Sequence, residues 1–225
     1  MRLLAIGDIH GHLTALDKLL ESVAPTESDT LIFLGDYVDK GPNVAQTIER
    51  LVELASTQNW IFLRGNHDQM FLDACLDSSQ VGIWETLAGE APLRSYGKGC
   101  TQSLLELVPD AHIDFLQNRC QNFYESDSFI FVHGGIRPHL EPSEEEIYRL
   151  QWMVLSSAAQ HLSTKTVVCG HSAQESGRIV DLGHTICIDT GISKGGFLTC
   201  LDLTNFRYVQ ASADGEVRSG CLRAG

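Results

Sequence analysis

Residues 31–41 read LIFLGDYVDKG, an apolar run that ends at a glycine and is followed by charged and polar side chains. The run 31–34 has no polar alternation, which is typical of a strand buried on both faces of a sheet. The same arrangement occurs at 2–6, before GDIHG, and at 60–63, before GNHD. The segments between these runs carry apolar residues at helical spacing. The order β-α-β-α-β predicts an α/β fold with a largely parallel sheet covered by helices.

The second half of the chain predicts a second, mixed sheet. Further apolar runs are found at 129–132, 166–169, 178–182, 185–188 and 197–202. The region before them, about 69–122, has no strong strand signal and shows short helical patterns instead. A chain of 225 residues is long enough to bury a sizeable core. We therefore expect residues 1–225 to form a single domain with a mainly helical insertion at about 69–122.

Composition and charge narrow the range of partners. The formal net charge of -13 argues against a nucleic acid or an anionic membrane, because both would repel the chain. The apolar run at 2–6 is too short for a signal peptide or a membrane span. The seven cysteines include no CxxC pair, which favours reduced thiols over a disulfide framework. These features predict a cytoplasmic protein, and they leave the oligomeric state open.

Polar motifs follow the apolar runs where each strand is expected to end. They are GDIHG at 7–11, GDYVDKG at 35–41, GNHD at 65–68, HGG at 133–135 and GH at 170–171. Ligands of open α/β sheets bind outside the carboxyl ends of the strands. Carboxylate and imidazole side chains are good ligands for divalent manganese, iron or zinc. Taken singly, each residue is more often a cap, a turn residue or a structural histidine, but their shared position favours a metal site.

A pair of divalent ions would give this site its chemistry. Their charge would exceed that of the two carboxylates Asp8 and Asp36, so the site would remain positive and attract phosphate. Two adjacent ions also lower the pKa of bound water and stabilise both the attacking and the leaving oxygen. This pattern indicates hydrolysis of a phosphoester.

The five motifs, in this order, resemble the metallophosphoesterase superfamily, and within it the bacterial and phage-type phosphoprotein phosphatases. The resemblance runs from Asp8 to about Asp202. It implies a calcineurin-like fold, which is a four-layer αββα sandwich of two mixed sheets with helices outside. It also implies two divalent metal ions. We expect Mn2+, with Fe, Zn or Ni as alternatives.

The resemblance assigns roles to particular residues. The implied metal ligands are Asp8 and His10 for the first ion, Asp36 as the bridge, and Asn66, His133 and His171 for the second ion. The implied general acid is His67, which Asp39 would orient by a hydrogen bond. Three cationic residues are candidates for phosphate contact: Lys40, Arg64 and Arg137.

The chain departs from the family pattern in three places. Lys40 stands where the family usually has Arg, which grips phosphate with a bidentate fork rather than as a point charge. Asp68 stands where eukaryotic relatives carry Glu. The segment 152–154 is Trp-Met-Val, whereas many bacterial relatives end it with Arg.

Three functions are consistent with this sequence. The first is hydrolysis of phosphomonoesters, above all phosphoserine and phosphothreonine in proteins, by direct attack of a metal-bridging hydroxide. The second is symmetrical hydrolysis of dinucleoside polyphosphates such as diadenosine tetraphosphate. Those enzymes resemble this chain in the same motifs, but their second motif often lacks the equivalent of Asp39. Asp39 therefore favours the phosphatase. The third is a catalytically silent metal-binding scaffold, which a missing ligand would favour. The expected partner is a phosphorylated protein or a small phosphoester.

Overall fold

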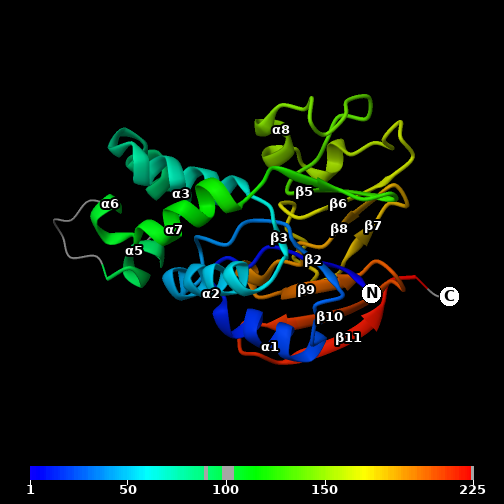
Figure 1. Ribbon diagram of the computed structural model, residues 1–225, viewed down its shortest axis with the longest axis horizontal. Coiled ribbons are helices and arrows are strands. Elements are labelled where there is room, and N and C mark those ends of the chain that lie inside the picture. The colour runs from blue at the N-terminus through cyan, green and yellow to red at the C-terminus, as the bar shows by residue number, and fades with distance from the viewer. Residues whose placement is uncertain (89–90, 98–103, 224–225) are drawn as a thin grey trace.

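The computed structural model describes residues 1–88, 91–97 and 104–223. It contains two mixed sheets with helices packed around them, which confirms the predicted fold class (Figure 1). The six-stranded sheet has the order β11-β10-β9-β1-β2-β3, and the five-stranded sheet has the order β4-β5-β6-β8-β7.

In the first sheet, β1 (Leu3–Ile6), β2 (Thr30–Phe33) and β3 (Ile61–Phe62) are parallel. The strands that extend it are antiparallel: β9 (Phe197–Asp202), β10 (Arg207–Ser212) and β11 (Val217–Cys221). In the second sheet, the parallel strands are β5 (Phe129–Val132), β6 (Thr166–Cys169) and β8 (Thr185–Cys187). Its two edges are β4 (Phe123–Glu125) and β7 (Val180–Asp181), both antiparallel to their neighbours.

Successive residues of each central strand face two different cores. Ala5 and Ile32 of the first sheet and Phe131 and Val168 of the second share one buried cluster, so the sheets pack face to face. The alternate residues of the first sheet, such as Leu4, belong to another cluster that includes the helices. Strands buried on both faces explain the unbroken apolar runs in the sequence. Each fully buried Leu, Ile or Phe contributes roughly 1.5–3 kcal/mol relative to an exposed one.

Helices cover the outer faces of both sheets. The first sheet is covered by α1 (Leu13–Val23) and α2 (Val44–Thr57), whose buried leucines pack against Leu4 and Phe33. The second sheet is covered by α8 (Ile147–Trp152), whose Leu150 packs with Ile130 and Val167. Figure 1 shows α1 below and α8 above the paired sheets, which gives the four layers.

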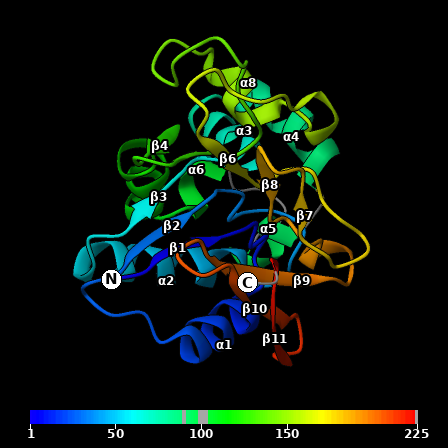
Figure 2. The ribbon, with the colours of Figure 1, turned by 90° about the vertical axis from the view of Figure 1, so that its right-hand side faces the viewer.

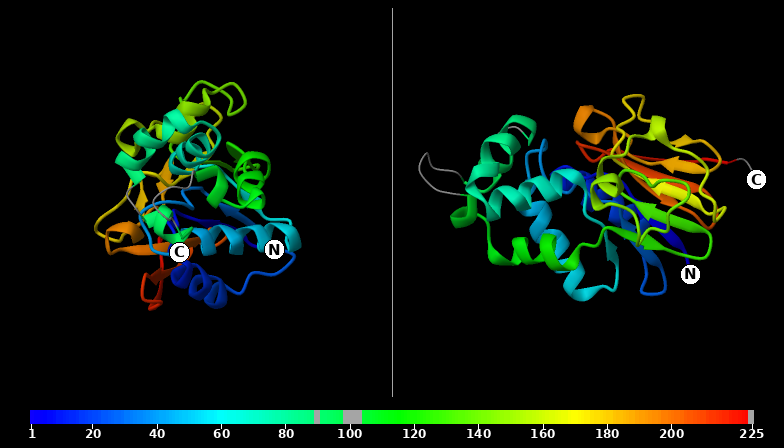
Figure 3. Two further views of the ribbon diagram at one scale, coloured as in Figure 1. Left: turned by 90° about the vertical axis from the view of Figure 1, so that its left-hand side faces the viewer. Right: turned by 90° about the horizontal axis from the view of Figure 1, so that it is seen from above.

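A run of helices separates β3 from β4. It comprises α3 (Asn66–Leu76), α4 (Val81–Ala88), α5 (Ala91–Ser95), α6 (Leu104–Leu107), α7 (Asp110–Asp114) and a π-helix (Phe115–Arg119). The right-hand view of Figure 3 shows these helices at one end of the molecule, beside the strands. The region predicted as a helical insertion, about 69–122, is largely this run. Residues 89–90 and 98–103 of it lie outside the described part of the chain.

The strands differ from the sequence prediction mainly in the antiparallel parts of the two sheets. The run at 197–202 was expected in the second sheet, but β9 pairs with β1 in the first. The strands β4, β10 and β11 were not predicted, because their residues are largely half-buried or exposed and lack a continuous apolar run. No helix among the described residues is long and apolar enough to cross a membrane. The six described cysteines are free thiols, and five of them are buried.

Candidate active site

The predicted metal ligands come from five strand ends and meet at one edge of the sandwich. Asp8 and His10 follow β1, and Asp36 follows β2. Asn66 begins α3 just after β3, while His133 and His171 follow β5 and β6. Ligand atoms of Asp8, Asp36 and His133 lie within 4.8 Å of one another, as do those of His10, Asp36 and His67. The structure therefore brings the predicted cluster together.

Several residues of this cluster have left-handed backbone. The φ angle is 46° at His10, 54° at Asp36, 69° at Asp39, 63° at Lys40 and 61° at His171. A left-handed conformation costs about 1–3 kcal/mol in a residue other than glycine, and it persists only where the surroundings enforce it. These turns direct side chains into the cluster, so stability is given up locally to arrange the site.

Asp36 occupies the centre of the cluster. Its Oδ2 lies 3.5 Å from His10 Nε2, and its Oδ1 lies 3.3 Å from His133 Nε2. Its Oδ1 also accepts a hydrogen bond of 3.0 Å from the backbone N–H of His67. The two carboxylate oxygens thus face different histidines, which is the arrangement that a bridging ligand needs.

The remaining ligand atoms converge on Asn66 and Asp8. Asn66 Oδ1 lies 3.0 Å from His133 Nε2 and 3.0 Å from His171 Nδ1. The carboxylate of Asp8 accepts a hydrogen bond of 3.1 Å from the backbone N–H of His171. Gly170 allows this approach, because a Cβ there would collide with Asp8 Oδ1.

Backbone carbonyls orient two of the histidine rings. His10 Nδ1 lies 2.8 Å from the carbonyl of Val38, and His133 Nδ1 lies 2.9 Å from that of Leu34. A carbonyl can only accept, so each Nδ1 carries the proton. In the neutral ring, Nε2 then directs its lone pair toward the acidic residues, as in metal-ligating histidines.

The electrostatics of the cluster favour a bound cation. Burial lowers the pKa of His10 to about 3 and that of His171 to about 4, so both rings are neutral and able to ligate. Burial opposes the charge of His133, but Asp36 outweighs it and raises the pKa of that ring to about 10. Burial likewise opposes the charge of Asp36, yet the neighbouring histidines hold its pKa well below the usual range.

The geometry around His133 Nε2 accounts for this stabilisation of positive charge. The nitrogen lies 3.3 Å from Asp36 Oδ1 and 3.0 Å from Asn66 Oδ1, and both oxygens are acceptors. A divalent cation bound among these atoms would satisfy them in place of a proton. The donor set of carboxylates, imidazoles and one amide oxygen therefore fits the metal ions that the sequence predicts.

His67 and Asp39 form a close pair beside the cluster. His67 Nδ1 lies 2.6 Å from Asp39 Oδ2. Burial lowers the pKa of His67, but Asp36 and Asp39 together outweigh it, so the pKa lies above its ordinary value. Trp84 of α4 donates from Nε1 to the other oxygen of Asp39, at 3.1 Å. Nothing in the local sequence pointed to Trp84, because its contact with Asp39 depends on how α4 folds back.

Asp68 is a second functional residue that the sequence did not assign. Its carboxylate accepts from the backbone N–H groups of Gly65 at 2.9 Å, Asp36 at 2.7 Å and Tyr37 at 2.8 Å. Burial and the charge of Asp36 raise the pKa of Asp68 to about 6. The carboxylate ties the turn after β2 to the start of α3. Its position in the GNHD motif was the sequence feature that could have identified it as part of the site.

Asp68→Asn is expected to weaken metal binding by about 10–100-fold, the usual cost of losing a group that orients metal ligands. The amide nitrogen can only donate, so it would face backbone N–H groups that are also donors. Titration calorimetry with Mn2+ would measure the affinity. The matched control is Asp73→Asn on the same helix, since Asp73 is exposed and its carboxylate accepts a hydrogen bond from the side chain of Gln69, away from the metal ligands. Equal affinities in the two variants would contradict this role.

The three candidate phosphate contacts differ in position. Lys40 Nζ lies 3.0 Å from His10 Nε2, so its ammonium is at the cluster. Arg64 instead donates to the carbonyls of Leu116 at 2.8 Å, Gln117 at 2.7 Å and Cys120 at 3.2 Å. Its guanidinium thus holds the end of the π-helix.

Arg137 is also engaged elsewhere. Its guanidinium pairs with the buried Glu145 at 2.7 Å and reaches Glu146 at 3.8 Å. Neither arginine is brought to the metal ligands, and both contribute to the packing of loops. Of the three candidates, the geometry supports only Lys40 as a phosphate contact.

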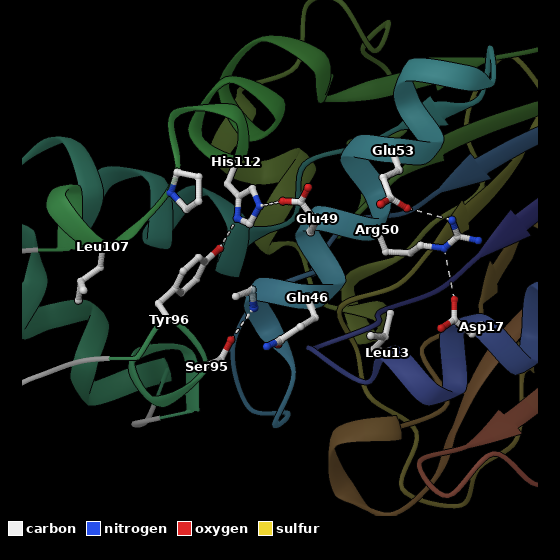
Figure 4. A pocket seen from close by; sticks show the side chains of 12 residues that line it. Leu13, Asp17, Gln46, Glu49, Arg50, Glu53, Ser95, Tyr96, Leu107 and His112 are labelled. Carbon is white, nitrogen blue, oxygen red and sulfur yellow. Dashed lines mark hydrogen bonds and ion pairs between the residues drawn. The ribbon is translucent and has the colours of Figure 1, made fainter.

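A sizeable cavity lies away from this cluster. It has a volume of about 470 Å³ and lies between α1, α2 and α5, where Arg50 joins Asp17 and Glu53 (Figure 4). On its far side His112 connects Tyr96 with Glu49. None of the predicted metal ligands lines it, so chemistry and not cavity size locates the active site.

The family of this chain follows from comparison with known proteins. The sequence model of the calcineurin-like phosphoesterase family matches residues 1–197. The chain belongs to this family. The predicted superfamily is thereby confirmed. Its members are phosphoester hydrolases with a two-metal site, and this chain brings together residues that could hold metal ions.

Individual relatives differ in activity. The chain is 31% identical over 163 residues to a symmetrical bis(5'-nucleosyl)-tetraphosphatase of Paracidovorax citrulli (strain AAC00-1). That match covers 67% of this chain and 52% of the relative, so the chain spans about half the length of that relative.

Two solved structures share the fold. One is a chain provisionally assigned as a diadenosine tetraphosphatase, with a TM-score of 0.68 and 19% identity, covering 100% of this chain and 95% of that one. The other is a protein serine/threonine phosphatase from Saccharomyces cerevisiae, with a TM-score of 0.62 and 13% identity, covering 100% of this chain and 81% of that one.

Proposed function

We propose that this chain hydrolyses dinucleoside polyphosphates symmetrically, cleaving an internal phosphate anhydride. The relative with 31% identity has this activity in its name, and this similarity carries the proposal. This ranking reverses the expectation from sequence, where Asp39 favoured a protein phosphatase. The site geometry is compatible with it, because Arg64 and Arg137 are held by other partners and Lys40 is the candidate cation at the cluster. An internal phosphate carries less charge than a terminal one and needs fewer cationic contacts.

The residues of the chain have separable tasks in this reaction. A bound pair of divalent ions would supply the nucleophile and polarise the phosphoryl group. Asp36 orders both halves of the ligand cluster, and Lys40 adds a donor for a phosphate oxygen. His67 holds a proton on the ring that Asp39 orients, ready for the leaving oxygen. We further propose Mn2+ as the resident ion, with Fe, Zn or Ni as alternatives, and a cytoplasmic location that suits the free thiols.

Hydrolysis of phosphomonoesters, including phosphoserine and phosphothreonine in proteins, is the second candidate. The observation that favours it is the pair of His67 and Asp39, supported by Trp84. An alkoxide leaving group is strongly basic and needs a proton donor, whereas a nucleoside diphosphate can leave without one. A catalytically silent scaffold is not favoured, because the predicted ligands are all present in the cluster.

A substrate panel on the metal-loaded protein would test this proposal. We expect diadenosine tetraphosphate to exceed a phosphoserine peptide in kcat/KM by about 100-fold or more, a difference that buried polar contacts readily produce. Symmetrical cleavage would give ADP as the nucleotide product, without AMP or ATP. A preference of that size for the phosphopeptide would replace the first proposal with the second. Two bound metals with no turnover of either substrate would indicate the scaffold.

A further inference from the structure

Two aromatic side chains of α8 lead from the surface to a metal ligand. Tyr148 and Trp152 stack with their ring centroids 5.9 Å apart and an interplanar angle of 19°. Trp152 in turn meets His171 edge to face, with centroids 6.1 Å apart and an angle of 75°. The two rings, called the aromatic platform below, therefore begin at the catalytic cluster and extend away from it.

The platform is open to solvent at its outer end. Tyr148 is 67% exposed, whereas Trp152 is half-buried against the site. The platform is also fixed in place, because α8 packs through Leu150 on the second sheet and contacts α3, which carries Asn66 and His67. Figure 2 shows α8 at the same end of the molecule as α3. A fixed, exposed ring stack beside a phosphate site is suited to holding a planar group of the substrate.

The charges around the platform are partly compensated. Four glutamates lie at 141–146, just before α8, and two of them have cationic partners. Glu145 pairs with Arg137 at 2.7 Å, and Glu146 lies 3.6 Å from Arg149 and 3.8 Å from Arg137. The platform itself is uncharged, so it can bind a ring by stacking without a preference for one hydrogen-bonding edge.

We propose that the aromatic platform is a nucleobase subsite, on which one base of the substrate stacks while its phosphates reach the metal ligands. This inference rests on the proposed function, because it supplies the recognition of a nucleoside that hydrolysis of a dinucleoside polyphosphate requires. The platform leads from His171 toward solvent through two ring contacts, with centroids 6.1 and 5.9 Å apart, so a base on its outer ring and a phosphate at the metal ligands would occupy neighbouring positions. The platform determines substrate specificity and takes no part in the chemical step.

A matched pair of ligands isolates the stacking contribution. Ribose 5-phosphate lacks the base of AMP. The Kd of ribose 5-phosphate divided by the Kd of AMP, both on the metal-loaded protein, therefore reports base recognition. We expect AMP to bind about 5–100-fold more tightly, as stacking on an aromatic side chain provides. The ratio should fall to about one in Tyr148→Ala and stay near the wild-type value in Tyr148→Phe. Titration calorimetry measures all six Kd values.

Ile147→Ala is the matched control for a change in α8 itself. Ile147 lies on the same helix and is 52% exposed, but it has no ring to stack. It should leave the AMP to ribose 5-phosphate ratio unchanged. A ratio near one in the wild-type protein, or an equal loss in Tyr148→Ala and Ile147→Ala, would overturn the base subsite.

Intrinsic fluorescence gives an independent readout. Trp152 is half-buried, whereas Trp60 and Trp84 are 7% and 1% exposed. AMP should quench the emission of Trp152, and ribose 5-phosphate should not. These binding data do not depend on turnover, so they decide the base subsite separately. If the wild-type protein prefers a phosphopeptide, the proposed function fails, yet tighter binding of AMP than of ribose 5-phosphate would still support the platform.

Discussion

Asp36→Asn is expected to lower kcat by about 10³-fold or more, which corresponds to roughly 4 kcal/mol of lost transition-state stabilisation. The two oxygens of Asp36 lie 3.5 Å from His10 and 3.3 Å from His133, so this one carboxylate serves both halves of the ligand cluster. The substitution removes its charge and replaces one oxygen by a donor. The positive φ of 54° is tolerated by Asn, and the amide oxygen can still accept from the N–H of His67. Activity should therefore fall without loss of the fold.

Metal content and stability distinguish this result from unfolding. Elemental analysis should find fewer than two ions per chain in Asp36→Asn, while urea unfolding should stay close to that of the metal-free wild-type protein. The control is Asp181→Asn, which makes the same change in charge at β7, where Asp181 pairs with Arg223. Full metal occupancy and near-normal turnover in Asp36→Asn would refute the assignment of the whole cluster.

The central strands and the ligands were predictable because both depend on local order in the sequence. An apolar run of only a few residues that is followed by a glycine is too short for a typical helix, so its length and its flanking residues predict a buried strand. The carboxyl ends of parallel strands meet at one edge, so residues such as Asp8 and Asp36 must approach each other once β1 and β2 pair. The order of the motifs along the chain therefore predicted which side chains lie together in the fold.

Contacts between distant segments were not predictable in the same way. Trp84 lies far along the chain from Asp39, and only the folding of α4 onto the site makes its hydrogen bond. Arg64 directly precedes the GNHD motif, so its sequence position suggested phosphate. In the structure, the guanidinium of Arg64 instead donates to the backbone carbonyls of Leu116 and Gln117 in the π-helix. Substrate preference was also not predictable from the sequence, because the surfaces that flank the cluster come from distant segments, the helical run and α8.

If His67 is the general acid, the loss of kcat on replacing it should depend on the leaving group of the substrate. His67→Asn should lower kcat by about 10²–10⁴-fold for a phosphoserine peptide, the usual contribution of proton transfer in the transition state. The loss should be far smaller for diadenosine tetraphosphate, because its leaving group is a weak base. Parallel losses on both substrates would instead indicate that His67 ligates a metal, which its position near His10 and Asp36 would allow.

The pH profile of Asp39→Asn separates these two roles further. A catalytic acid works only while protonated, so activity is lost as pH rises through its pKa. Burial lowers the pKa of His67, and the charges of Asp36 and Asp39 outweigh it, which extends the active range upward. Removing the charge of Asp39 should shift the alkaline limb of kcat toward lower pH. Trp84→Phe keeps that charge and removes one hydrogen bond from it, so it should shift the limb less. If the limb stays fixed in Asp39→Asn, it reports another group, and the proton for the leaving oxygen does not come from His67.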